Sequence, residues 1–207
     1  VKAVSDLVAW AGGENGEVLR TVDGGENWIS VGSGVDTISV VSVESFDENS
    51  AFTVSYSGDY IKPSGMAQIH ATNNGGDSWA KLYEQHTWLN HLKMFDQSNG
   101  IALGDPENGY WSILKTTNSG NSWEPINNQP AAAEGAWGSV HCHCWIDNLN
   151  GWFGTNTPNV YHTTDGGTTW TEHTIPHLNR TTTICFNSSG FGIVGASNGS
   201  MVRTDDG

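Results

Sequence analysis

The chain has 207 residues, with 8 Lys and Arg against 22 Asp and Glu, so its formal net charge is −14. This length is enough to bury the core of one large domain, and an acidic chain without a basic cluster excludes a surface that neutralises nucleic-acid phosphates. No apolar run approaches the roughly 20 residues of a membrane-spanning helix, which excludes direct membrane insertion.

Short segments of alternating polarity follow one another along the chain and predict an all-β fold. The first unit begins at 1–4 with only the last residues of its leading strand, which is the first strand of a unit. Because no signal peptide precedes these residues, we expect the native start to lie upstream. In the second unit, strands are expected at 37–46, 51–57, 67–72 and 78–83. In the third, they are expected at 88–95, 100–104, 111–117 and 122–126. In the fourth, they are expected at 138–146, 151–155, 160–164 and 169–174. In the fifth, they are expected at 181–186, 191–195 and 200–204.

Four of the ten tryptophans close the same eight-residue phrase. The copies are Thr21-Val-Asp-Gly-Gly-Glu-Asn-Trp28, Thr72-Asn-Asn-Gly-Gly-Asp-Ser-Trp79, Thr116-Thr-Asn-Ser-Gly-Asn-Ser-Trp123 and Thr163-Thr-Asp-Gly-Gly-Thr-Thr-Trp170. A fifth copy starts at Thr204. The third positions are Asp23, Asn74, Asn118, Asp165 and Asp206, with spacings of 51, 44, 47 and 41. A period in the forties indicates a propeller whose blades each hold about four strands.

The composition of the phrase is typical of a tight turn. The Asp or Asn side chain accepts hydrogen bonds from backbone N–H groups inside the turn, and glycine takes the positive φ that other residues resist. We therefore assign these residues to the scaffold and not to catalysis. The tryptophans at the end of the phrase, Trp28, Trp79, Trp123 and Trp170, are expected to be buried between neighbouring sheets.

The phrase resembles the Asp-box, or bacterial neuraminidase repeat, of sialidases, sortilin-type receptors and photosystem II assembly-factor-like propellers. The amino-acid sequences of residues 100–106 and 152–156 are most similar to those of the assembly-factor-like propellers of exported bacterial surface proteins. The resemblance covers essentially the whole chain and implies a β-propeller. Because the fifth unit lacks its outer strand, we interpret residues 1–207 as one partial propeller domain, about four and a half blades of a six- to eight-bladed ring. A five-bladed ring with an unusual seam is the alternative. The approximate blade boundaries are 1–32, 33–84, 85–127, 128–175 and 176–207.

An enzymatic function is the alternative. A sialidase needs three converging arginines, but Arg20 and Arg203 directly precede phrase threonines, at the end opposite the usual site. A two-carboxylate glycosidase, with catalytic residues partly outside this sequence, remains as the second hypothesis. Its acids would be sought among Asp105, Glu107 and Glu134, which we interpret as solvated loop residues.

The segment His141-Cys142-His143-Cys144 is the other chemically suggestive stretch. A regular strand would place both histidines on one face and both cysteines on the other, which is unsuited to a single zinc site. We favour packing residues here and expect no metal and no cofactor. A disulfide from Cys142 or Cys144 to Cys185 is the alternative, and it requires Cα atoms within about 7 Å.

The main hypothesis is a non-catalytic binding propeller of a secreted or cell-surface protein. Its protein or glycan partner is expected on the loop face, formed by the loops opposite the phrase turns, because these loops are longer and more varied. The chain is expected to continue into further domains. Glu107 and Asn156 suit contact with a partner as neighbours of the main candidates. The binding candidates are Tyr60, Trp88, Asp105, Tyr110, Trp137 and Arg180.

Overall fold

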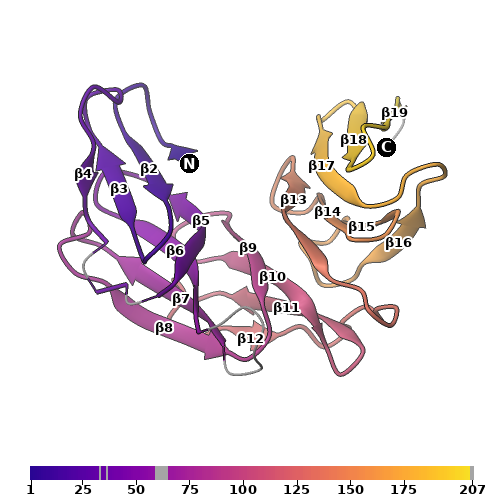
Figure 1. The fold of residues 1–207 in the computed structure, drawn as a ribbon, viewed down its shortest axis with the longest axis horizontal. Coiled ribbons are helices and arrows are strands. Elements are labelled where there is room, and N and C mark those ends of the chain that lie inside the picture. The colour runs from indigo at the N-terminus through magenta and orange to yellow at the C-terminus, as the bar shows by residue number, and fades with distance from the viewer. Residues whose placement is uncertain (33, 36, 59–64, 206–207) are drawn as a thin grey trace. The chain divides into compact units, whose positions relative to one another are not determined.

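The computed structural model describes residues 1–32, 34–35, 37–58 and 65–205. Every regular element in this part of the chain is a β-strand, which confirms the all-β prediction. Five sheets follow one another along the chain, four with four strands and one with three (Figure 1). Among the described residues there is no helix with the length and apolar character needed to span a membrane.

The strands of each sheet are consecutive in sequence. The first sheet contains β1 (Lys2–Ala3), β2 (Ala9–Gly12), β3 (Val18–Thr21) and β4 (Ile29–Ser30). The second contains β5 (Ser39–Ser45), β6 (Ala51–Ser57), β7 (Met66–Thr72) and β8 (Ala80–Gln85). The third contains β9 (Leu89–Met94), β10 (Gly100–Glu107), β11 (Tyr110–Thr116) and β12 (Glu124–Pro125). The fourth contains β13 (Gly138–Trp145), β14 (Gly151–Thr155), β15 (Asn159–Thr163) and β16 (Thr171–Thr174). The fifth contains β17 (Thr181–Phe186), β18 (Gly192–Ala196) and β19 (Met201–Thr204).

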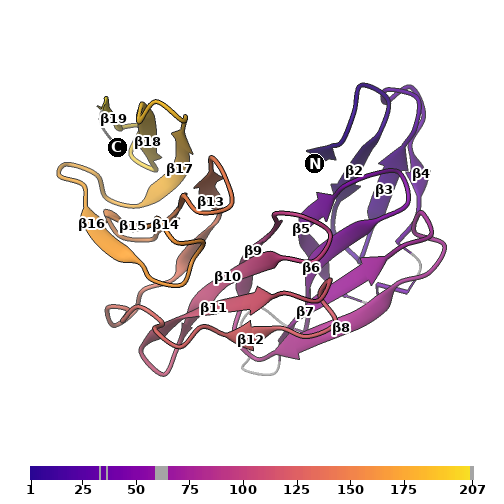
Figure 2. The same ribbon diagram turned by 180° about the vertical axis from the view of Figure 1, so that it is seen from behind.

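The predicted strands of the second to fifth units are confirmed, with differences of a few residues at their ends. In the first sheet the expected tail of a first strand at 1–4 is the two-residue strand β1, and three further strands follow it. The outer strand of the third sheet, Glu124–Pro125, is shorter than the predicted 122–126. In every sheet each strand pairs with the next in sequence, and this up-and-down order builds a propeller blade (Figure 2).

The described chain forms two compact units. The first unit comprises residues 1–102 and 115–124, and the second comprises 103–114 and 125–207. The core of the first unit joins two sheets around Trp10, which is fully buried. Trp79 packs edge-on against Trp10, with ring centroids 6.2 Å apart, and its Nε1 donates a hydrogen bond of 2.6 Å to the Val31 carbonyl.

The core of the second unit joins β13–β16 to β17–β19. Trp152, 5% exposed, lies between two parallel rings, with centroid distances of 4.3 Å to His162 and 4.1 Å to Phe186. Cys142, Ile184 and Val194 complete this cluster. Stacking between rings of neighbouring strands and sheets thus fixes the packing of this core.

The phrase forms the same turn in its first four copies. In each, the threonine hydroxyl donates to the Asp or Asn Oδ1 at 2.8–3.0 Å and accepts from the N–H four residues on at 2.9–3.0 Å. The Oδ1 also accepts from a backbone N–H four residues further, as in Asp23 with Asn27. These side chains are used within their own turns, and the fifth copy passes out of the described residues at Asp206.

A second recurring turn, between the first and second strands of a sheet, was not predicted. Asp47, Asp96 and Asp147 each accept hydrogen bonds from the N–H groups two and three residues on. In the first sheet the Ser5 hydroxyl accepts the equivalent hydrogen bonds, from the N–H groups of Leu7 and Val8. Backbone hydrogen bonds join the two kinds of turn, for example from Gly75 N to Asn49 O at 2.9 Å.

The expected burial of the four phrase tryptophans is only partly correct. Trp123 is buried, with 3% of its surface exposed, and Trp79 and Trp170 are half-buried. The prediction is wrong for Trp28, which is 39% exposed. The turn places the ring, but burial depends on contact with another sheet. The Trp28 indole stays close to its own turn, where a Cβ built on Gly25 would lie 3.6 Å from Nε1.

The expected regular alternation of 141–144 is also wrong. A bulge interrupts the pairing of β13 between Gly138 and His143, and His141 has a φ of 62°. As a result Val140 and His141 are both exposed. Bulges recur in the leading strands β5 and β17.

Candidate functional site

Three of the six predicted binding residues come together in the second unit. Asp105 lies in β10, two residues before its end and not in the loop that was expected for it and for Glu107. Trp137 directly precedes β13, and Arg180 directly precedes β17. Tyr110 begins β11 in the same unit. We call the group formed by Asp105, Trp137, Asn156 and Arg180 the loop cluster.

The loop before β13 is held by Asn156, which follows β14. The Asn156 Oδ1 accepts from Trp137 N at 2.9 Å, and its Nδ2 donates to Gly135 O at 3.0 Å. Asn156 N donates in turn to Trp137 O at 2.9 Å. The sequence pointed to Asn156 as a contact residue, but the structure uses its amide to fix the backbone on both sides of Ala136.

A second set of hydrogen bonds fixes the strands on which the cluster stands. Asp105 Oδ1 accepts from Gly138 N at 2.8 Å. Ser139 Oγ donates to Thr181 O at 2.7 Å, and Thr181 Oγ1 donates to Thr155 O at 2.8 Å. Three strands, β13, β14 and β17, are thereby locked at the positions that carry Trp137 and Arg180, so the two side chains are held by a rigid frame.

The Arg180 guanidinium stacks on the Trp137 ring, with its Cζ 4.2 Å from the ring centroid. Trp137 is 39% exposed, so this cation–π pair lies at the surface. No described residue forms an ion pair with Arg180 or accepts a hydrogen bond from its guanidinium, and its Nε is buried without a partner. The four N–H groups of its two terminal nitrogens are therefore not used by the described residues and can bind a ligand.

Tyr110 stands apart from this stacked pair as a half-exposed ring, with 51% of its surface exposed. It forms a bridge with Ala131, and neighbouring backbone groups pair with the same loop, from Trp111 N to Pro130 O at 2.9 Å and from Ala132 N to Gly109 O at 2.8 Å. The long loop before β13 therefore lies along the start of β11, and Tyr110 extends the apolar surface of this region.

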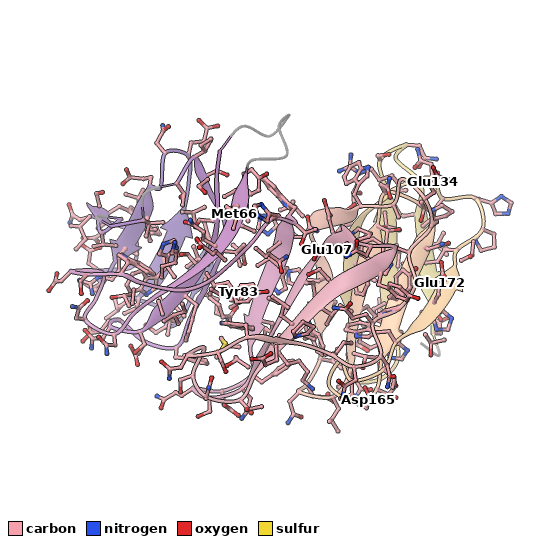
Figure 3. The ribbon with its side chains drawn as sticks, turned by 90° about the horizontal axis from the view of Figure 1, so that it is seen from below. Met66, Tyr83, Glu107, Glu134, Asp165 and Glu172 are labelled. Atoms are coloured by element: carbon pink, nitrogen blue, oxygen red, sulfur yellow. The ribbon has the colours of Figure 1, made fainter. Side chains whose placement is uncertain are left out.

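The three acids considered for a glycosidase, Asp105, Glu107 and Glu134, lie in the second unit. The Asp105 carboxylate binds a backbone N–H, while Glu107 and Glu134 are exposed. Figure 3 shows Glu134 and Asp165 at opposite ends of the unit, with the phrase turn at the end far from the loop cluster. Turn hydrogen bonds lower the pKa of other carboxyls: to about 2 for Asp23, chiefly through the Asn27 N–H, and below its usual value for Asp147, chiefly through the Asn150 N–H.

Two predicted residues cannot be joined to the loop cluster. Trp88 lies in the first unit, half-buried, with its ring centroid 4.3 Å from that of Tyr56. The Trp88 ring therefore packs against the Tyr56 ring within the first unit. Tyr60 lies outside the described residues.

The three cysteines are free thiols. Burial raises the pKa of Cys142 to about 11, and burial likewise raises the pKa of Cys144, whose Sγ accepts from Phe186 N at 3.1 Å. Within the described ranges, no group of three His, Cys, Asp or Glu side chains is placed to hold a metal ion. Cys142 and Cys144 pack in the core of the second unit, whereas Cys185 is exposed.

No family model matches the chain, and no curated protein matches it. Its structure is similar to solved β-propellers. YCF48 bound to D1 peptide matches with a TM-score of 0.69 at 18% identity, over 98% of this chain and 61% of that one. A GH74 enzyme of Niastella koreensis matches with a TM-score of 0.62 at 20% identity, over 96% of this chain and 28% of that one. The six-bladed fucose-binding lectin of Aleuria aurantia matches with a TM-score of 0.57 at 14% identity, over 95% of this chain and 73% of that one.

These similarities show the β-propeller fold, and the five consecutive sheets are consistent with a partial propeller. The chain spans about three fifths of YCF48 and less than a third of the GH74 enzyme. The matched proteins include both binding proteins and an enzyme, so the fold alone selects neither function.

Proposed function

We propose that this chain is a non-catalytic recognition propeller of the Asp-box type, belonging to a secreted or cell-surface protein, and that it binds a protein or glycan through the loop cluster. The observation that carries the proposal is the Arg180 guanidinium, which is stacked on an exposed tryptophan and has no hydrogen-bond acceptor among the described residues. Tryptophan and arginine are the residue types that most often dominate the energy of interfaces.

The chemistry of the cluster defines what the partner presents. The Trp137 ring offers an apolar face, and the guanidinium offers a planar fork of donors, which pairs best with a carboxylate. The chain as a whole is strongly acidic, so an anionic group would be attracted locally by Arg180 and repelled by the rest of the surface. We therefore expect the partner to place one acceptor group on Arg180 and an uncharged surface on Trp137.

The carboxyls that lock the turns are unsuited to the acid step of hydrolysis. A glycosidase acid needs a raised pKa so that it is protonated when it acts. The turn hydrogen bonds shift the pKa of Asp23 and of Asp96 in the opposite direction, below the usual value. For Asp96 the main cause is a hydrogen bond from the Asn99 side chain.

Arrays of synthetic peptides and of glycans, probed with the purified protein, test the proposal. For a ligand found there, we expect Trp137→Ala and Arg180→Gln each to weaken binding by about 30-fold, since both remove a central contact. Glu26→Lys with Asp77→Lys, placed on the phrase turns, serves as the matched control and keeps the affinity. Binding that survives the first two changes and fails in the control would place the functional surface on the opposite rim.

Cell fractionation tests the location. We expect the native protein in the medium or at the cell surface, and recovery in the cytosolic fraction alone would contradict export.

A further inference from the structure

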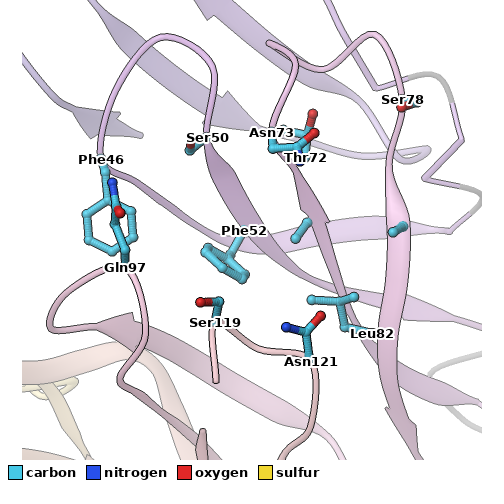
Figure 4. A pocket seen from close by; sticks show the side chains of 12 residues that line it. Phe46, Ser50, Phe52, Thr72, Asn73, Ser78, Leu82, Gln97, Ser119 and Asn121 are labelled. Carbon is cyan, nitrogen blue, oxygen red and sulfur yellow. The ribbon is translucent and has the colours of Figure 1, made fainter. Parts of the chain in front are cut away.

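A cavity of about 460 Å³ opens in the first unit, between the sheets β5–β8 and β9–β12. It lies at the end of the sheets that carries the phrase turns, which is opposite to the end with the loops between second and third strands. Its wall is built from both kinds of turn, the phrase turns after β7 and β11 and the turns before β6 and β10. Figure 4 shows Phe46 and Gln97 on one side, Leu82 and Asn121 on the other, and Phe52 between them.

The lining is uncharged. Two phenyl rings, Phe46 and Phe52, form an apolar wall, and the polar part consists of amide and hydroxyl groups from Asn73, Gln97, Ser119 and Asn121. In a chain with a formal charge of −14, a cavity without a single ionisable side chain is distinctive. It offers no cation to an anionic ligand and no carboxylate to a cationic one, so a neutral ligand fits it best.

Several of these polar groups are unused by the fold. The side chains of Asn73 and Gln97 form no hydrogen bond with any described residue, unlike the Asn74 and Asp96 side chains beside them. Asn121 uses its Nδ2 on Asn118 O, at 2.6 Å, which leaves its Oδ1 as an acceptor. The cavity therefore presents both donors and acceptors at its edge.

Ser119 gives an independent indication of function. Its φ is 63°, and the three other described copies of the turn have glycine at this position, at Gly24, Gly75 and Gly166. A side chain in this region of φ is strained, and such strain is concentrated at functional sites. In the third copy of the turn, the residue at this strained position is Ser119, and it lines the cavity.

A buried donor without a partner among the described residues lies next to the lining of the cavity. Trp123 is 3% exposed, and its Nε1 has no partner among the described residues. A Cβ built on Gly120 would lie 3.4 Å from this nitrogen, 2.9 Å from Phe52 Cε1 and 3.1 Å from Leu82 Cδ1. The indole N–H is thus next to two side chains of the wall, whereas the matching nitrogen of Trp79 has a carbonyl acceptor.

We propose that this cavity is a binding site for one neutral saccharide unit. A sugar ring presents C–H groups on its face, which suit Phe46 and Phe52, and hydroxyl groups around its edge, which suit the amides of Asn73 and Gln97. The volume lies within the range of small-ligand pockets, roughly 300–1,000 Å³. The proposal is independent of the loop cluster, which belongs to the other unit and uses different residues.

Saturation-transfer NMR with the methyl glycosides of glucose, galactose, mannose, xylose, fucose and N-acetylglucosamine tests the site. We expect at least one of them to bind with a dissociation constant of about 1 mM, as is usual for a ligand of this size. Asn73→Ala with Gln97→Ala is expected to weaken it at least tenfold. The matched control, Thr117→Ala with Asn148→Ala, changes the same turn positions in the next sheets and keeps the affinity.

Ser119→Gly separates a ligand role from a structural one. Glycine relieves the positive φ, so we expect a higher Tm together with at least threefold weaker saccharide binding. The proposal is overturned if none of the six glycosides gives saturation transfer with the wild-type protein, or if the Asn73/Gln97 variant binds as the wild type does.

Discussion

Trp28 and Trp123 close the first and third copies of the same phrase, yet one is 39% exposed and the other 3%. The turns that carry them are equivalent, with Thr21 and Thr116 donating to Asp23 and Asn118 at 2.8 and 3.0 Å. The hydrogen bonds of a repeat are therefore set by the repeat itself, while the burial of its tryptophan is set by the sheet against which it packs.

The largest effect expected from this comparison is at Trp123. We expect Trp123→Ala to lower the free energy of unfolding by about 3–5 kcal/mol, because it deletes a buried aromatic beside Phe52 and Leu82. Chemical denaturation followed by circular dichroism measures it. A loss below 1 kcal/mol would show that Trp123 and Trp28 are equivalent after all.

The next effect concerns His70, two residues before Thr72, where the first and third copies have Leu19 and Leu114. Burial, with a smaller contribution from Lys81, lowers the pKa of His70 to about 4. Between pH about 6.5 and about 4 the unfolded chain binds a proton at this residue that the folded chain does not. We therefore expect the free energy of unfolding to fall by about 2 kcal/mol as the pH decreases through this window.

Denaturation series at several pH values test this. His70→Leu, which installs the residue of the first and third copies, is expected to remove this part of the pH dependence. An unchanged profile in that variant would show that His70 titrates normally in the folded protein.

A smaller and uniform effect is expected at the turn threonines. Thr21→Val and Thr72→Val each remove a hydroxyl that donates to the Asx side chain and accepts from Gly25 or Gly76. We expect both to cost about 1–2 kcal/mol, because each leaves an N–H unsatisfied. Thr→Ser at the same positions is the control. Costs that differ between the copies by more than about 1 kcal/mol would contradict the equivalence of the turns.

The smallest effect is expected at Trp28. Because the ring is exposed, Trp28→Ala is expected to lower the free energy of unfolding by less than about 1 kcal/mol. The same denaturation assay used for Trp123 measures it. A loss near that of Trp123→Ala would mean that Trp28 is covered in solution.

The fold was predictable because its signal is repeated. One copy of the phrase would have indicated a turn, but copies at spacings of 41–51 residues fix the unit, and alternation within each unit fixes the strands. The bulge before His143 was not predictable, because it depends on backbone conformation that alternation does not encode. The turns at Asp47, Asp96 and Asp147 could have been found, since an acid follows the last apolar residue of each leading strand.

The sites were less accessible to sequence reasoning. Trp137 and Arg180 could be named separately, but their contact depends on the backbone fixed by Asn156. The cavity between β5–β8 and β9–β12 was missed entirely, because the turn rim was interpreted as scaffold. The side chains that lock the turns are indeed used there, but Asn73 and Gln97, beside them in sequence, are not. Comparing the copies position by position, as for Ser119, is the signal that could have found it.

The hydrogen bonds of the phrase turns join residues that are only two to four positions apart. Such contacts lose little chain entropy when they form, so each turn can nucleate its own hairpin before any sheet meets another. Folding in a repeat of this kind can start at more than one copy and spread to its neighbours. Duplication of a unit would then add a new turn that can nucleate folding together with the new strands. A longer chain of this kind would therefore not have to fold more slowly.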